Sequence, residues 1–312
     1  MKEHVSSHHH IQEHHEEHSH GTIDPSITTS ERGIWALKWS MVGFIITSGI
    51  QFLIVLLSGS VALLTDAIHN FGDAGTAIPL WFAFQLSKRK PNQKFTYGLG
   101  RAEDLAGLFI LVVILLTTIV AGYEAVQRLI HPQHLHNLWI VIIAALVGFG
   151  GNEIIAHIRI KVGKEIQSAA LVADGQHARI DGLASLAVII GVVGAWLGYP
   201  IVDPLVGIGI IFIILHTLWE AGEEILTRLL DGIDEEIIEQ IHSAVHHADG
   251  VEKLTDIRAR WCGHLLFVEL TILVNNALTV EKGHVIASDV RHELLDHMPH
   301  VADVAVHIEP MQ

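Results

Sequence analysis

Two apolar segments of the chain carry the same spacing of acidic and histidine side chains, D-x-x-H-x-x-x-D. The six residues are Asp66, His69, Asp73, Asp174, His177 and Asp181. Ionisable side chains are costly inside a membrane helix, and those that occur there are functional candidates. Histidine and carboxylate are also common ligands of transition metals.

The spacing determines which atoms can act together. Residues four apart lie on one face of a helix, so His69 and Asp73 form one pair, and His177 and Asp181 form a second. The two pairs together offer two nitrogens and two oxygens, which is a four-coordinate shell of the kind that zinc takes. The sequence therefore predicts a metal site between these two segments.

Asp66 and Asp174 precede the two histidines by three residues on the same helical face. We expect them to hydrogen-bond the ligating histidines and orient their rings. Two alternatives remain open for the whole pattern. Each acid could pair with a histidine or a basic residue to offset its burial, or the two sets could relay protons without a metal. Matched spacing on two segments favours the metal, because packing has no need for it.

The elements that position these residues are membrane helices. Half of the residues are hydrophobic and only 17% are charged, against about 25% in an ordinary soluble domain. Each apolar segment is long enough for the roughly 20 residues that span a bilayer. We place the six segments at 34–57, 61–86, 102–129, 138–157, 168–198 and 202–227. The fold class that follows is an all-α membrane domain over 34–230, embedded in a lipid bilayer.

The polar N-terminal segment, residues 1–33, has eight of the 24 histidines within its first twenty residues. It lacks the apolar residues needed for a core, and we expect a disordered tail that captures metal. The formal net charge of −15 argues against nucleic acid as a partner, since that would require a basic face.

Basic residues set the orientation, because they gather in cytoplasmic loops. They follow the second and fourth predicted spans and are Lys88, Arg89, Lys90, Lys94, Arg101, Arg159, Lys161 and Lys164. Both termini are then predicted to be cytoplasmic, in a protein of the plasma or inner membrane. We interpret Glu103 and Asp104, next to Arg101, as an interfacial ion network on the cytoplasmic side.

The pattern changes at Asp231, where a second domain over 231–312 is predicted. Helical spacing covers 234–248 and 280–298, and alternating strand-like segments cover 251–261, 264–274 and 301–309. This order is an αββαβ domain of the α+β class. Motifs for metalloprotease, nucleotide-hydrolysing and serine-hydrolase chemistry are missing from the sequence, so we do not expect an enzyme.

From about residue 34 to its C-terminus, the sequence resembles the cation diffusion facilitator family of metal–proton antiporters. The matching stretches are LLTDAIHNFGD, FTYGLGRAED, VADGQHARIDGLASL and YPIVDPLVGIGI. The resemblance implies a homodimer with six membrane helices and a metallochaperone-like cytoplasmic domain. It also implies that His69, Asp73, His177 and Asp181 bind the transported ion. That ion would be Zn²⁺, or Cd²⁺ or Co²⁺, exported in exchange for protons.

The resemblance implies a further metal site at the C-terminal end, in the stretch VHIEP. This stretch offers His307 and Glu309, which His284 could join, and zinc bound there would be a regulatory ligand. Zinc is then the substrate, and no prosthetic group is expected. A metal-selective channel and a membrane-bound metal sensor are the alternatives. Accumulation of metal against its gradient separates the transporter from both.

Overall fold

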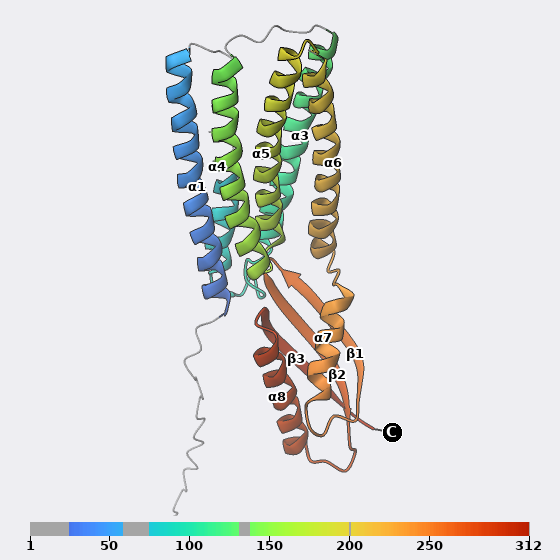
Figure 1. Cartoon of the computed structure of the whole chain (residues 1–312). Helices are drawn as coiled ribbons and strands as arrows, with labels where there is room; N and C mark the ends of the chain where they lie inside the picture. Colours follow the sequence, from blue (N-terminus) through green and yellow to red (C-terminus); the bar gives the residue numbers. More distant parts are fainter. Residues whose placement is uncertain (1–24, 59–74, 131–137, 200, 312) are drawn as a thin grey trace, which may run out of the picture.

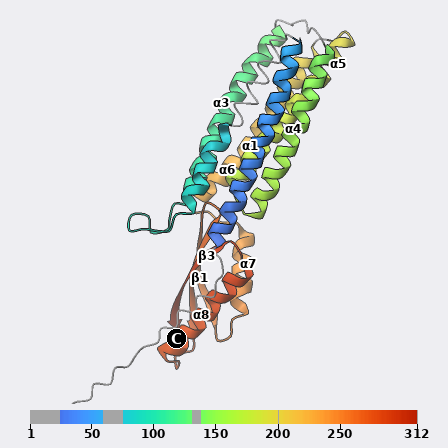
Figure 2. The ribbon, with the colours of Figure 1, turned by 90° about the vertical axis from the view of Figure 1, so that its left-hand side faces the viewer.

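The computed structural model describes residues 25–58, 75–130, 138–199 and 201–311. A bundle of long helices stands end to end with a smaller α/β domain (Figure 1), and the view turned by 90° shows the same elongated arrangement (Figure 2). The described helices and strands follow the predicted order, and the fold class is confirmed.

Five of the described helices are long and apolar enough to cross a membrane. They are α1 (Pro25–Ser58), α3 (Ala102–Ile130), α4 (Leu138–Glu165), α5 (Ala169–Trp196) and α6 (Val202–Leu229). The remaining predicted span, 61–86, falls mostly outside the described residues, although residues 75–87 are helical. Two boundaries differ from prediction, since α1 begins at Pro25 rather than 34 and α4 continues to Glu165 rather than ending at 157.

Helix α5 is the centre of the described bundle, because it packs against α4, α6 and α3. Small residues bring α4 and α5 close together. A Cβ atom on Gly175 would lie 2.8 Å from the Ile160 side chain and 2.9 Å from Arg159. A Cβ atom on Gly163 would lie 2.8 Å from Val172. The two backbones can therefore approach as small residues allow in membrane helix pairs.

The C-terminal domain has the predicted αββαβ order. Its elements are α7 (Glu235–His246), β1 (Lys253–Cys262), β2 (Leu265–Val274), α8 (Val280–His297) and β3 (Val301–Pro310). The strand order is β1-β2-β3, with β1 and β2 antiparallel and β2 and β3 parallel. Helices α7 and α8 cover one face of this sheet (Figure 2), and the core between them includes Ile241, Val268 and Val290.

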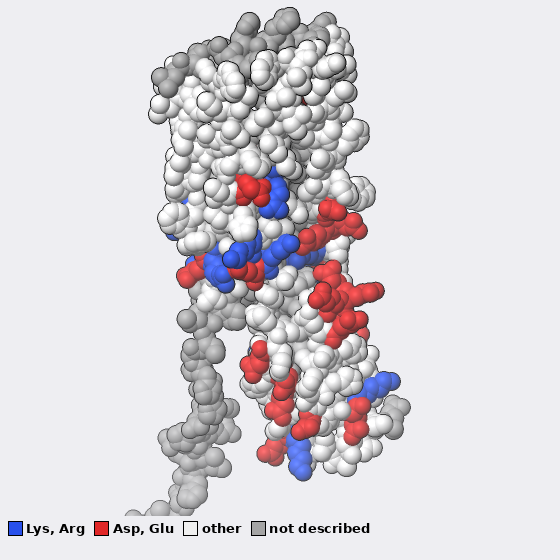
Figure 3. All heavy atoms as spheres, in the orientation of Figure 1, with Lys and Arg blue, Asp and Glu red and all other residues white. Residues whose placement is uncertain are grey.

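The surface shows where the bundle is apolar. Above the junction of the two parts, the face seen in Figure 3 is almost free of charged side chains, whereas side chains of both signs are concentrated on this face at the junction. Large apolar residues such as Phe109, Leu116 and Ile119 are more than half exposed on the bundle. This distribution is typical of helices that face lipid, with the charged side chains at the membrane surface.

Candidate functional site: a histidine–carboxylate pair and the base of the bundle

Helix α5 presents His177 and Asp181 on one face. The Nε2 atom of His177 lies 3.5 Å from Oδ2 of Asp181, and the two side chains are 8% and 14% exposed. The predicted i, i+4 pair is thus formed, with a nitrogen and a carboxylate oxygen directed at one point. Helix α5 could therefore supply two ligands, one nitrogen and one oxygen, to a metal ion.

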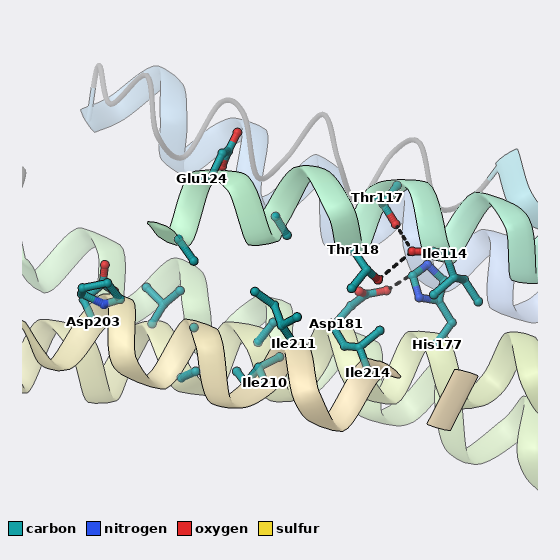
Figure 4. A pocket seen from close by; sticks show the side chains of 17 residues that line it. Ile114, Thr117, Thr118, Glu124, His177, Asp181, Asp203, Ile210, Ile211 and Ile214 are labelled. Carbon is teal, nitrogen blue, oxygen red and sulfur yellow. Dashed lines mark hydrogen bonds and ion pairs between the residues drawn. The ribbon is translucent and has the colours of Figure 1, made fainter. Parts of the chain in front are cut away.

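The pair borders a cavity between α3, α5 and α6 with a volume of about 330 Å³. Figure 4 shows His177 and Asp181 beside Thr117 and Thr118 of α3, while Asp203 of α6 lies further along the cavity. Thr117 and Thr118 donate hydrogen bonds to the carbonyl oxygen of Ile114, at 3.0 and 2.7 Å. Much of the remaining wall is aliphatic. A cation in this cavity would therefore meet a nitrogen and a carboxylate together at His177 and Asp181, with the further carboxylates of Glu124 and Asp203 elsewhere on the wall.

The partner triplet, Asp66, His69 and Asp73, lies outside the described residues. The described helix of residues 75–87 follows it directly in the sequence. The four-ligand shell therefore stays a prediction, of which the structure shows the α5 half.

Asp174 has partners other than the predicted histidine. Its Oδ2 atom lies 2.7 Å from Nη1 of Arg159 on α4, with side chains 0% and 1% exposed. Its Oδ1 atom accepts a hydrogen bond of 3.3 Å from the Thr76 hydroxyl. The predicted hydrogen bond to His177 is thus replaced by a buried ion pair. An ion pair of this kind was one of the alternatives left open for the sequence pattern.

Arg159 was expected in a cytoplasmic loop, and this expectation was wrong. It lies on α4 and is fully buried, with its guanidinium carbon 5.2 Å from the centroid of the Phe44 ring of α1. The predicted span ended at residue 157, just before the charge of Arg159, and the buried ion pair with Asp174 compensates that charge. The available signal was the single charge within the apolar stretch that continues from Ile155 to Ile160.

A second buried polar group lies at the base of the bundle. The β1–β2 connection is the two-residue turn Gly263–His264, since Cys262 pairs with Leu265. Gly263 has a φ of +65°, which is suited to the first position of a tight hairpin turn. The turn directs His264 into the bundle.

His264 contacts three helical segments at once. Its Nδ1 lies 2.6 Å from Oε2 of Glu103 on α3, and both side chains are at most 1% exposed. Its Nε2 lies 3.3 Å from the Ser30 hydroxyl of α1. Its ring centroid is 5.7 Å from that of Phe84. Sequence reasoning did not identify His264, because its partners are more than 160 residues away.

Glu103 and Asp104 were interpreted as an ion network with Arg101. In the structure, the acidic residues and Arg101 have different partners. Asp104 accepts a hydrogen bond of 3.1 Å from the Gly263 backbone N–H. Arg101 instead forms an ion pair with Asp231 and donates a hydrogen bond of 2.9 Å to the carbonyl oxygen of Leu229. The three residues thus join the bundle to the C-terminal domain along separate contacts.

Burial shifts two ionisable groups of the C-terminal domain. Burial raises the pKa of the Cys262 thiol, although Arg101 acts in the opposite direction. Burial lowers the pKa of His300, and the nearby His264 and Arg228 add to this effect. Both shifts disfavour the charged form, as expected for desolvated groups.

Two of the three residues predicted for a C-terminal metal site lie close together in the single chain. His307 and Glu309 lie on β3, with Nε2 of the histidine 3.7 Å from Oε1 of the glutamate, and both side chains are more than half exposed. Among the described residues, no three His, Cys, Asp or Glu side chains are arranged to hold a metal ion. His284 on α8 is therefore not gathered with them within one chain.

Known protein families cover nearly the whole chain. Residues 37–230 match the cation efflux transmembrane domain, and residues 233–311 match the cytoplasmic domain of cation efflux proteins. The chain belongs to the cation efflux family. Cation efflux proteins, or cation diffusion facilitators, are transporters rather than enzymes, so the chain is a multi-pass membrane transporter of cations with a cytoplasmic C-terminal domain.

Several relatives extend over most of the chain. A probable cation efflux system protein of Mycobacterium tuberculosis is 44% identical over 298 residues, covering 95% of this chain and 90% of that protein. The manganese efflux system protein MneP of Bacillus subtilis is 26% identical, covering 82% and 88%. A solved MamM-CTD chain is 26% identical and covers 25% of this chain and 98% of its own, with a TM-score of 0.25.

Proposed function

We propose that this cation efflux protein exports Zn²⁺ from the cytoplasm in exchange for protons. The observation that carries the proposal is the His177–Asp181 pair, 3.5 Å apart on the wall of a cavity between membrane helices. The same spacing recurs in His69 and Asp73. Two nitrogens and two carboxylate oxygens suit zinc, whereas manganese and magnesium prefer more oxygen ligands.

Proton exchange follows from the chemistry of such ligands. A metal ligand must be deprotonated, so zinc and protons compete for the same atoms. Histidine titrates near neutral pH, which places this competition in the physiological range. Zinc from the cytoplasm displaces protons, and protons from the opposite side expel the zinc after the helices rearrange.

We also propose that the transporter is a homodimer in the plasma or inner membrane, with both termini in the cytoplasm. The match of residues 233–311 to the cytoplasmic domain supports the side on which the C-terminus lies. In a dimer, His307 and Glu309 of one protomer could meet ligands of the other, including His284, and bind regulatory zinc. Their exposure on β3 supports such a shared site.

The direct test is zinc uptake into proteoliposomes with an imposed pH gradient. We expect the protein to accumulate zinc above the external concentration only while the gradient lasts. Zinc that merely equilibrates at every pH would indicate a channel, and zinc binding without flux would indicate a sensor.

Manganese is the second candidate substrate, because relatives such as MneP are named manganese efflux proteins. Uptake of Mn²⁺ should be measured in the same vesicles. Manganese transport faster than zinc transport would contradict the zinc assignment and leave the cation efflux function in place.

A further inference from the structure

We propose that Thr76, Asp174 and Arg159 are positioning residues that fix the relative placement of the two ligand-bearing segments. This inference rests on the proposed function and goes beyond it, because none of the three residues is among the four proposed zinc ligands. Asp174 lies at the centre of the group. One of its oxygens accepts a hydrogen bond from Thr76, and the other faces Arg159.

The position of the group in the sequence connects it to both ligand pairs. Thr76 follows Asp73 by three residues, and Asp174 precedes His177 by three. The Thr76–Asp174 hydrogen bond of 3.3 Å therefore joins the two segments three residues along the sequence from a proposed ligand of each. Within α5, residues three apart lie on the same face, which Asp174 shares with His177.

Arg159 gives this link its geometry. The ion pair between Arg159 and Asp174 is 2.7 Å long and fully buried, so water cannot compete for either group. The close approach of α4 and α5 at Gly175, the neighbour of Asp174, keeps the base of the Arg159 side chain against α5. The guanidinium also lies over the ring of Phe44, with 5.2 Å between the guanidinium carbon and the ring centroid. The ion pair thus directs Oδ2 of Asp174 toward Arg159, while Oδ1 accepts the hydrogen bond from the Thr76 hydroxyl.

The consequence for transport is a fixed distance between the two ligand pairs. A four-coordinate zinc site tolerates little displacement of its ligands, and groups that orient ligands typically contribute about 10- to 100-fold to metal affinity. Loss of the link should loosen the site without removing a ligand. Zinc would then bind more weakly, and its preference over larger cations should decrease.

The test compares zinc affinity in the full-length, purified transporter, titrated with Zn²⁺ and then with Cd²⁺ and Mn²⁺. Thr76→Val removes one hydroxyl and keeps the shape of the side chain. Its matched control is Thr47→Val, since Thr47 donates a hydrogen bond of 2.9 Å to the carbonyl oxygen of Gly43 in its own helix. Asp174→Asn keeps the shape of the acid and removes its charge.

We expect Thr76→Val and Asp174→Asn to weaken zinc binding by about 10-fold each, with a smaller preference for zinc over manganese. The effects of Thr76→Val and Asp174→Asn should be less than additive in the double variant, because both changes disturb the same group of contacting residues. Transport should show a raised KM at nearly unchanged kcat. Arg159→Lys keeps the positive charge beside Asp174. The transporter with this substitution should bind zinc more tightly than the transporter with Arg159→Gln.

Two outcomes would overturn the inference, and they are distinguishable. If His177→Ala and Asp181→Ala abolish zinc binding while Thr76→Val behaves like Thr47→Val, the positioning role is wrong and the proposed site stands. If His177→Ala and Asp181→Ala leave zinc binding intact, the proposed site itself is wrong, and the inference falls with it. The comparison of Thr76→Val with Thr47→Val tests the positioning role even if the Arg159→Gln variant does not fold.

Discussion

At the scale of single residues, the surroundings of each buried carboxylate determine whether it can bind a cation. The buried carboxylate of Asp174 has a guanidinium partner, whereas His177 and Asp181 face each other across 3.5 Å at a cavity. The first arrangement compensates two charges and leaves no demand for a cation. The second leaves a nitrogen and an oxygen directed at a space where an ion fits. This difference in surroundings supports the positioning role that we propose for Asp174 and the binding role that we propose for Asp181.

His300 provides a prediction at the same scale. Its pKa is lowered, so the unfolded chain binds more protons than the folded one below the ordinary histidine pKa of about 6.5. The stabilising effect of keeping His300 neutral is present above that pH and is lost as the pH falls further. We expect the melting temperature to decrease when the pH is lowered from 7.5 to 5.5. The decrease should be smaller in the His300→Gln variant than in the wild type.

The measurement is thermal unfolding of the detergent-solubilised protein with a metal chelator present. His292→Gln is the control, because His292 is exposed on α8. An equal pH dependence in His300→Gln and the wild type would contradict the role assigned to His300.

At the scale of elements, the β1–β2 turn is the most constrained connection. Gly263 has a φ of +65°, and a Cβ atom there would lie 2.6 Å from the carbonyl oxygen of Gly100 and 2.8 Å from the Glu103 carboxylate. Gly263→Ala therefore combines backbone strain with a steric clash. We expect it to destabilise the protein by about 2 kcal/mol, measured by chemical or thermal unfolding.

The matched control is Gly150→Ala on α4, where nothing lies within 4 Å of the added Cβ. Alanine has a higher helix propensity than glycine, so this change should be neutral or slightly stabilising. Equal stability of the two variants would contradict the constraint at the turn.

Most element boundaries could be predicted from the sequence, and the exceptions have physical causes. The predicted strand 264–274 is β2 almost residue for residue, because its β-branched alternation is a local property. The end of α4 and the start of α1 were misplaced, since an apolar window stops at charged or polar residues. Arg159 is tolerated in α4 only because Asp174 lies on the neighbouring helix.

The contacts of the candidate site likewise include some that could be predicted from the sequence and some that could not. The pairing of His177 with Asp181 follows from helical spacing and could be predicted. The partners of Asp174 and of His264 depend on contacts between distant segments, which a single sequence without its tertiary packing does not reveal.

At the scale of the whole molecule, His264 connects the cytoplasmic domain to the bundle. It reaches Glu103 of α3, Ser30 of α1 and Phe84 at the same time. A shift of the C-terminal domain, such as one caused by metal binding there, would therefore act directly on these helices. The contact gives the domain a physical means of influencing transport.

Glu103→Gln tests this connection. Weakening a buried polar contact typically costs about 1 to 3 kcal/mol, so the junction should open more often. We expect faster amide hydrogen exchange in the segment around Gly263 and slower zinc transport. Arg291→Gln is the control, because it breaks an exposed pair with Asp303 at 3.0 Å, and surface pairs contribute at most about 1 kcal/mol. Identical exchange in both variants would show that the junction does not depend on the contact between Glu103 and His264.

The central claim is that zinc and protons compete for His177 and Asp181. The most direct measurement is calorimetric titration of zinc into the purified transporter at several pH values and in buffers of different ionisation enthalpy. We predict that zinc binding releases protons and strengthens from about pH 6 to 8, as expected for histidine and carboxylate ligands. We also predict that a variant with both His177→Ala and Asp181→Ala loses this binding. Zinc affinity that does not change with pH, or that survives in the double variant, would contradict the claim.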